Sequence, residues 1–207
     1  MKRSNCRLPL GGPAKQRGFT LLEALIAMLV LVFGMLGAAL LMVRAQQVEF
    51  ESYQRKHALM LVDDFVSRMQ ANRRVASQPN CYSITTDTST GSPFLGTGNS
   101  TVFNCTAGFA QESARANADM LALEAALLGA GETAGGSNVG ALLNARGCVS
   151  VAGDAINGYT YTVSVAWQGR SETAAPSASA NCGKNQYGSE TLRRVVTATF
   201  FVPFLGS

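Results

Sequence analysis

The most constraining feature of this 207-residue chain is an uncharged run of twenty residues from Ala24 to Val43. At about 1.5 Å of rise per residue, a helix over this run spans roughly 30 Å, the thickness of the hydrocarbon core of a bilayer. Five lysine and arginine side chains precede Gly18 without any acidic residue among them. The run therefore predicts a single-pass helix in the inner membrane, with a cytoplasmic N-terminus and an exported C-terminal part.

The charge distribution excludes a nucleic-acid-binding surface. The formal net charge is +4, but the five basic residues before Gly18 leave 12 basic and 13 acidic side chains for the rest of the chain. No basic patch remains that could bind phosphates, so nucleic acid is not expected as a partner.

Catalysis is not expected either. His57 is the only histidine, and no nucleophile motif surrounds any serine. The glycine-rich segment 129–140 lacks the Gly-Lys-Ser/Thr ending of a phosphate-binding loop. The cysteines form no Cys-x-x-Cys pair, so zinc is not expected. We therefore expect neither enzymatic activity nor a metal or other cofactor.

Glu23 is an unusual residue at the start of an apolar run. A carboxylate inside a membrane segment costs about 2.5–3.5 kcal/mol at the centre and less near an end. Such a residue is a candidate for function, although a side chain so near the end of the run could also reach the membrane surface.

The stretch Gly18-Phe19-Thr20-Leu21-Leu22-Glu23, preceded by a short basic leader and followed by an apolar run, resembles the start of a type IV prepilin. The resemblance implies that prepilin peptidase removes residues 1–18 by cutting between Gly18 and Phe19, and methylates the new N-terminal Phe19. It also implies that Glu23 of one subunit pairs with the Phe19 amine of a neighbour during assembly. A secretory signal fits less well, since its apolar core is normally only 7–15 residues long.

A long helix is expected from residue 19 to residue 74, apolar all round over 19–43 and amphipathic over 44–74. No glycine or proline interrupts the chain between Val43 and Pro79, and apolar residues recur with helical spacing in the second half. The expected apolar stripe consists of Val48, Tyr53, Ala58, Leu61, Val62, Phe65, Val66 and Met69. Such a stripe needs a globular head to cover it, and residues 75–207 remain to form one.

The head is expected to combine a helix with an antiparallel sheet. Residues 113–128 show the pattern of a second helix, with Met120, Leu123, Leu127 and Leu128 on one side. Strands are expected at 148–151, 159–167 and 193–202, the last two pairing across the 170–192 loop. The predicted fold class is α+β and pilin-like: a long N-terminal helix packed on a small antiparallel sheet, with Trp167 in or near the core.

Four cysteines lie in the expected head: Cys81, Cys105, Cys148 and Cys182. In an exported chain they predict two disulfides. Three connectivities are possible, and we favour the local pairing of Cys81 with Cys105 and of Cys148 with Cys182. Each would close a loop worth roughly 3–4 kcal/mol in the chain-entropy model.

The stretch Asp63–Arg73 and the order of elements in the head resemble PilV-type minor pilins. The resemblance implies a low-copy subunit that primes or completes pilus assembly near the tip and supports twitching motility and adhesion. Its partners would be other minor pilins, the major pilin and a tip adhesin, and its final location the extracellular pilus. Two alternatives stay open: a minor pseudopilin of a type II secretion system, and a membrane-anchored periplasmic binding module.

Overall fold

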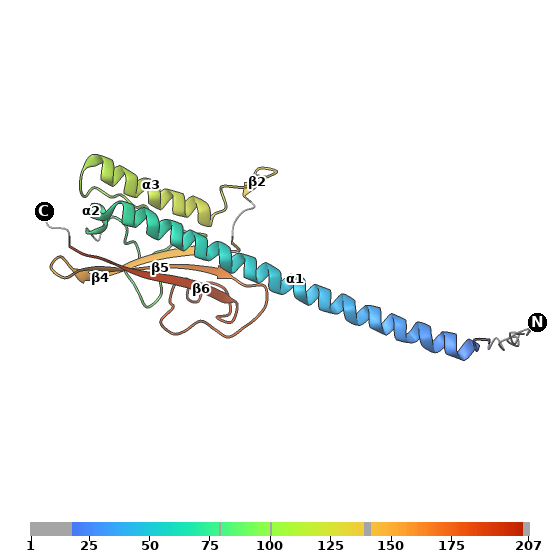
Figure 1. The fold of residues 1–207 in the computed structure, drawn as a ribbon. Coiled ribbons are helices and arrows are strands. Elements are labelled where there is room, and N and C mark those ends of the chain that lie inside the picture. The colour runs from blue at the N-terminus through green and yellow to red at the C-terminus, as the bar shows by residue number, and fades with distance from the viewer. Residues whose placement is uncertain (1–17, 79, 100, 139–141, 205–207) are drawn as a thin grey trace, which may run out of the picture. The chain divides into compact units, whose positions relative to one another are not determined.

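The computed structural model describes residues 18–78, 80–99, 101–138 and 142–204, so most of the expected leader lies outside the described residues. The chain divides between Gln46 and Gln47 into an N-terminal unit and a globular unit. Helix α1 (Leu21–Ala71) begins in the first unit and ends in the second. The fold is α+β, with this long N-terminal helix and a four-stranded antiparallel sheet, as predicted (Figure 1).

In the globular unit, α1 buries a narrower stripe than the sequence predicts. Its buried residues are Gln54, Ala58, Val62, Phe65 and Met69. Val48 and Tyr53 are 67% and 66% exposed, so their inclusion in the stripe was wrong. At about 100° per residue, Tyr53 lies some 140° around the helix from Ala58, whereas Gln54 lies only some 40° away.

After α1 the chain turns at Asn72, whose backbone N–H donates to the Met69 carbonyl (3.1 Å), and enters the short helix α2 (Arg73–Ala76). Helix α3 (Ala110–Leu127) begins three residues before the expected start. The Glu112 carboxylate accepts a hydrogen bond from the Phe109 N–H (3.2 Å), which supplies a partner for an otherwise unpaired group at the helix start. Leu128 lies beyond the helix and is exposed, contrary to the expectation.

The sheet contains β1 (Leu95–Gly96), β4 (Arg146–Asp154), β5 (Gly158–Gln168) and β6 (Arg193–Val202), in the order β1-β4-β5-β6. Every neighbouring pair is antiparallel. The register places Tyr161 opposite Val151 on β4 and Phe200 on β6. Strands β5 and β6 match the predicted segments closely, whereas β4 extends well beyond the predicted 148–151. A small hairpin of β2 (Thr133–Ala134) and β3 (Ser137–Asn138) lies in the glycine-rich segment.

One face of the sheet packs against α3 and the second half of α1 (Figure 1). Tyr161, Val163 and Val165 project from β5 into this core, and Trp167 joins them with 3% of its surface exposed. A second, smaller cluster lies on the opposite face, under the chain that connects β5 to β6. It consists of Cys148, Ala166, Cys182 and Tyr187, with Phe94 and Val195 packed against it.

Candidate functional site

The expected processing segment lies in exposed, non-helical backbone directly before α1. Gly18, Phe19 and Thr20 are all exposed and belong to no helix, and Phe19 is 78% exposed. The Thr20 hydroxyl oxygen accepts a hydrogen bond from the Glu23 backbone N–H (3.3 Å), so Thr20 caps the helix start. The Gly18–Phe19 peptide bond is therefore accessible to a peptidase and lies outside the regular helix.

Gly18 is not required by the packing of the described residues. A Cβ atom added to Gly18 would meet nothing within 4 Å, and its φ is not in the left-handed region. Recognition by a peptidase would be a reason for glycine here that does not depend on this packing.

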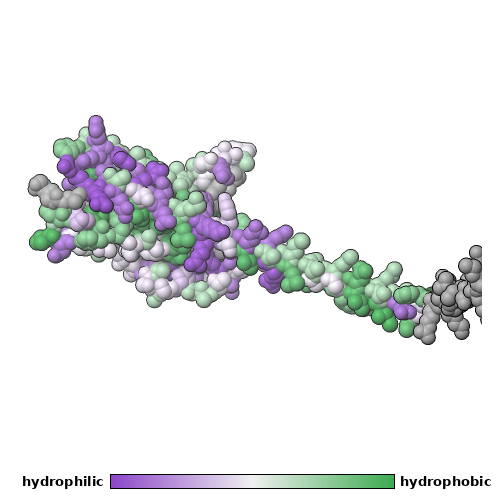
Figure 2. All heavy atoms as spheres, in the orientation of Figure 1, coloured by the Kyte–Doolittle hydropathy of each residue, from purple (hydrophilic) through white to green (hydrophobic). Residues whose placement is uncertain are grey.

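The N-terminal unit presents an apolar surface on all sides of the helix. Every residue from Leu21 to Phe50 is exposed, and this stretch of α1 is long and apolar enough to cross a membrane. Figure 2 shows hydrophobic residues dominating this helix, which contrasts with the mixed surface of the globular unit. Glu23 is the only acidic residue between Gly18 and Val48, and it lies in the first turn of α1.

The comparisons with known proteins point to the same segment. The family model for the prokaryotic N-terminal methylation motif matches residues 13–39. The match supports a type IV prepilin-like protein, processed by prepilin peptidase and assembled with other pilin-like subunits, and favours a structural subunit over an enzyme. With the apolar helix, it fits anchoring in the inner membrane. Neither the curated proteins nor the solved structures include a significant match.

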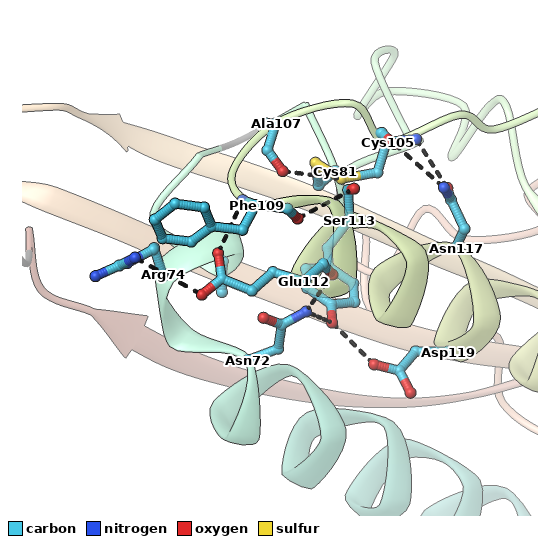
Figure 3. Close-up of a disulfide and its surroundings, with 12 residues drawn as sticks. Asn72, Arg74, Cys81, Cys105, Ala107, Phe109, Glu112, Ser113, Asn117 and Asp119 are labelled. Atoms are coloured by element: carbon cyan, nitrogen blue, oxygen red, sulfur yellow. Dashed lines mark hydrogen bonds and ion pairs between the residues drawn. A yellow bond between two sulfur atoms is a disulfide. The ribbon is translucent and has the colours of Figure 1, made fainter.

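In the globular unit, the structure joins Cys81 to Cys105 and Cys148 to Cys182, the pairing favoured from the sequence. The first disulfide ties the chain after α2 to the segment before α3 (Figure 3). Asn117 of α3 supports it, because its side chain accepts a hydrogen bond from the Cys105 N–H (2.8 Å) and donates to the Cys105 carbonyl (3.2 Å).

A buried polar network beside this disulfide connects the turn after α1 to α3 (Figure 3). The Tyr82 hydroxyl donates to Asp119 (2.9 Å) and accepts from the Asn72 amide (3.1 Å), which also donates to the Glu112 carbonyl (2.9 Å). Burial raises the pKa of Tyr82, so the phenol remains a neutral donor at physiological pH. The network supplies partners for polar groups that burial would otherwise leave unpaired.

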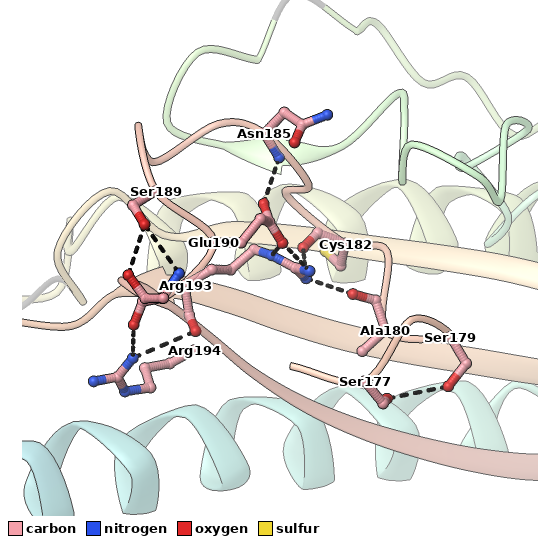
Figure 4. A network of polar contacts seen from close by, with 10 residues as sticks. Ser177, Ser179, Ala180, Cys182, Asn185, Ser189, Glu190, Arg193 and Arg194 are labelled. Carbon is pink, nitrogen blue, oxygen red and sulfur yellow. Dashed lines mark hydrogen bonds and ion pairs between the residues drawn. The ribbon is translucent and has the colours of Figure 1, made fainter. Parts of the chain in front are cut away.

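The connection between β5 and β6 is held onto the sheet by two arginines. Arg193 is 3% exposed, and its guanidinium donates to Glu190 (2.7 Å from Nε) and to the carbonyls of Ala180 and Cys182 (Figure 4). Although burial acts to raise the pKa of the Glu190 carboxyl, hydrogen bonds from Arg193 and the Asn185 N–H hold it below its usual range.

Arg146 is the second buried arginine, and it has a different environment. Its guanidinium lies over the rings of Phe94 (5.1 Å) and Tyr187 (4.9 Å). None of the ion pairs among the described residues involves Arg146, and its buried Nε has no hydrogen-bond partner there. Aromatic faces thus provide the main compensation for burying this cation.

Sequence reasoning missed a polar contact between α1 and the start of β6. Glu51 accepts a hydrogen bond from the Ser171 hydroxyl (2.7 Å) and pairs with Arg194 (3.5 Å). These residues are more than a hundred positions apart in sequence, so no local pattern identifies the contact. Thr20 was also missed as a helix cap, although the spacing Thr-x-x-Glu at the helix start is a recognisable capping signal.

Metal-ligating side chains do not cluster in the described residues of the globular unit. No group of three or more His, Cys, Asp or Glu side chains converges there. His57 is half-buried beside Tyr53, with 6.3 Å between ring centroids. The residues expected to take part in processing and assembly, Gly18, Phe19 and Glu23, lie instead in the N-terminal unit.

Proposed function

We propose that this protein is a minor type IV pilin, a low-copy subunit that primes or completes pilus assembly near the tip. In this role it would support twitching motility and adhesion. The observation that carries the proposal is the methylation motif, placed on an exposed segment that leads directly into a helix whose residues 21–50 are all exposed and include the uncharged run from Ala24 to Val43. The resemblance of Asp63–Arg73 to PilV-type minor pilins supports the choice of a minor subunit.

The proposed mechanism begins with the leader, residues 1–18. Its positive charges hold the N-terminus in the cytoplasm while the globular unit is exported. Prepilin peptidase cuts after Gly18 and methylates the Phe19 amine, and the apolar helix keeps the subunit in the inner membrane. Assembly then moves this helix from lipid into a bundle of similar helices, and head-to-tail contacts that do not close extend as a filament.

Glu23 would set the axial position of each incoming subunit. At about 4 Å and an effective dielectric constant near 20, its attraction to the Phe19 amine of a neighbour is about 4 kcal/mol. The net gain is smaller because both ions must lose water. A mispositioned subunit would leave one of these charges unpaired in an apolar bundle, and this costs more free energy than a correctly placed pair gains.

The partners in this proposal are prepilin peptidase, other minor pilins, the major pilin and a tip adhesin. Before assembly the inner membrane is the protein's environment, and afterwards the extracellular pilus.

Mass spectrometry of sheared surface filaments and washed membranes from the native cell tests the proposal. We expect a peptide that begins at methylated Phe19 in the filament fraction. A processed chain confined to membranes would instead favour a minor pseudopilin, which a loss of protein secretion with intact twitching in a deletion strain would support. A chain that retains residues 1–18 and occurs only in membranes would contradict both and leave the anchored binding module.

A further inference from the structure

The two edges of the four-stranded sheet differ greatly in length. One edge is β1, which has only two residues, and beside it the N–H groups of Ile84 and Thr85 donate to the Val149 carbonyl (3.0 and 2.9 Å). The other edge is β6, ten residues long and paired only with β5. Strand β6 therefore has one side along which its backbone groups are not used by the sheet.

The register identifies which backbone groups face away from β5. The Gly169 N–H donates to the Leu192 carbonyl (2.7 Å), just beyond the last paired residues, Gln168 and Arg193. Antiparallel pairs alternate between hydrogen-bonded and non-hydrogen-bonded, so the even-numbered residues of β6 bond to β5. The Val149 carbonyl leads to the same assignment. It accepts hydrogen bonds from Ile84 and Thr85 and so points away from β5, which makes Val149 and Val163 a non-hydrogen-bonded pair. The backbone groups of Val163 therefore face β6 and bond to Ala198, an even-numbered residue.

The outward groups belong to Val195, Thr197, Thr199 and Phe201. Among the described residues, none of these four makes a backbone hydrogen bond outside the strand pairing. Thr197, Thr199 and Phe201 are exposed, and Phe201 exposes 57% of its surface. The free edge of β6, defined as these four residues, thus offers a row of accessible donors and acceptors.

The free edge lacks the features that normally prevent strand addition. From Val195 to Val202 there is no charged residue and no proline. Sheet proteins usually place lysine, proline or a bulge on a long edge, because an unprotected edge pairs with other chains. Because these eight residues carry no charge, a charged strand added along the edge would find no counter-ion. An uncharged strand is therefore the favoured occupant.

A hollow of about 230 Å³ lies where the free edge begins. It is lined by Val48, Glu51, Ser52, Arg55, Trp167, Arg194 and Val195. Glu51 and Arg194 neutralise each other across it (3.5 Å), while Trp167 and the two valines supply apolar surface. An added strand could place one apolar side chain in this hollow, which would anchor the strand in register.

We propose that the free edge of β6 binds an extended, uncharged segment of a second polypeptide, which adds to the sheet as a further strand. The occupant is a different protein rather than a second copy, and this part of the proposal rests on the proposed function. The β1 edge is too short, so a copy could offer only its own β6.

The direction of α1 argues against pairing two copies. Arg194, at the start of β6, contacts Glu51, whereas Phe200, near its end, lies opposite Tyr161, which bonds to Ala76 beyond the end of α1 (2.8 Å). The globular part of α1 and β6 therefore run in the same direction. Antiparallel pairing of two β6 strands, the more stable arrangement, would point the globular parts of the two α1 helices in opposite directions. Such a contact uses the same surface on both copies and closes at two subunits, so it could not extend the head-to-tail filament of the proposed function.

Residue-resolved amide hydrogen exchange on the full chain in detergent micelles, with both disulfides intact, tests the proposal. The probe is a synthetic peptide of alternating threonine and valine with a lysine at each end. We expect saturating peptide to slow exchange at the four outward amides by about tenfold or more, with Val196, Ala198 and Phe200 already protected. The same peptide N-methylated at alternate residues should have no effect, because it cannot donate to the edge.

A matched pair of variants locates the binding. Thr199→Lys puts a charge on the free edge and should abolish the slowing. Thr160→Lys puts the same charge on an exposed position of the neighbouring strand β5 and should leave it intact. Thr197→Lys is a second edge variant to be used if Thr199→Lys does not fold.

Two results would overturn the proposal. Unchanged exchange at the outward amides with saturating peptide would show that the edge does not accept a strand. Outward amides that are protected without peptide, and lose that protection on dilution, would show that a second copy occupies the edge. Both results are independent of whether the protein enters pili, so failure of the proposed function is recognised separately.

Discussion

At the scale of single residues, Asp119 is a buried carboxylate of α3 that contacts both α1 and the chain after α2. It is 4% exposed, accepts a hydrogen bond from Tyr82 and lies 3.6 Å from the Arg68 guanidinium. We expect Asp119→Ala to lower the free energy of unfolding by about 2–3 kcal/mol, because it leaves the buried Tyr82 hydroxyl without an acceptor. Urea unfolding of the detergent-solubilised chain measures this. Asp63→Ala, which removes an exposed carboxylate from α1, is the control, and an equal effect of both changes would contradict the assigned role.

Substitutions of Arg146 test whether the stability of the globular unit requires a planar cation against the rings of Phe94 and Tyr187. Lysine keeps the charge but loses the flat stacking surface, while methionine keeps apolar volume without the cost of burying a charge. We therefore expect Arg146→Lys to reduce the free energy of unfolding by about 1–2 kcal/mol, and more than Arg146→Met. Urea unfolding again measures the difference. The reverse order would mean that the charge itself, through a partner yet to be found, is required.

A substitution of Glu23 tests the assembly of subunits and not the stability of the globular unit. We expect Glu23→Ala to reduce incorporation into surface filaments by about tenfold or more, since the Phe19 amine of a neighbour would lose its counter-ion in an apolar bundle. The urea midpoint of the globular unit should not change, because Glu23 lies outside that unit. Immunoblots of sheared filaments and membranes give the readout, with Glu49→Ala as the control on the polar part of α1. Normal incorporation of the Glu23 variant would refute the pairing.

At the scale of elements, the Cys148–Cys182 disulfide holds the long connection between β5 and β6 against the sheet. The two cysteines are 34 positions apart, and closing such a loop is worth roughly 3–4 kcal/mol in the chain-entropy model. We expect the Cys148→Ser/Cys182→Ser double variant to be cleaved by protease first within the 170–192 connection. Cys81→Ser/Cys105→Ser should instead expose the segment between α2 and α3. Limited proteolysis with peptide mapping distinguishes them, and identical first cuts would contradict this division.

The elements that sequence patterns predicted are those whose signal is local and long. Alternation along β5 and β6, and the uncharged run of α1, need no knowledge of distant residues. Strand β4 was predicted too short because Gly147, Ala152 and Gly153 weaken its pattern, and its nine residues are extended by pairing with β5. The two-residue strands β1, β2 and β3 have no periodicity to detect. Likewise the Gly18–Glu23 motif was visible in the sequence, whereas the Asn72–Tyr82–Asp119 network and the Glu51–Arg194 pair join distant segments.

At the scale of the whole molecule, the order of the parts along the chain separates this protein from one with an ordinary signal peptide. The expected cut after Gly18 comes before the apolar run of α1, so the run stays attached to the globular unit when the leader is removed. A secretory signal loses its apolar core on cleavage and releases the exported part. Cleavage after Gly18 would therefore change the N-terminus and remove five positive charges without ending the attachment to the membrane.

This order gives a test that needs no filament. When the chain is produced together with an active prepilin peptidase, we expect it to lose the mass of residues 1–18 and still remain in the membrane fraction after carbonate extraction. Its uncharged run of twenty residues is long enough to span the bilayer without the leader. Gly18→Leu, which adds a side chain where the described residues leave free space, should block cleavage without changing membrane retention. Release of the processed chain into the soluble fraction would show that the cut lies beyond the apolar run, and would remove the basis for a pilin-like role.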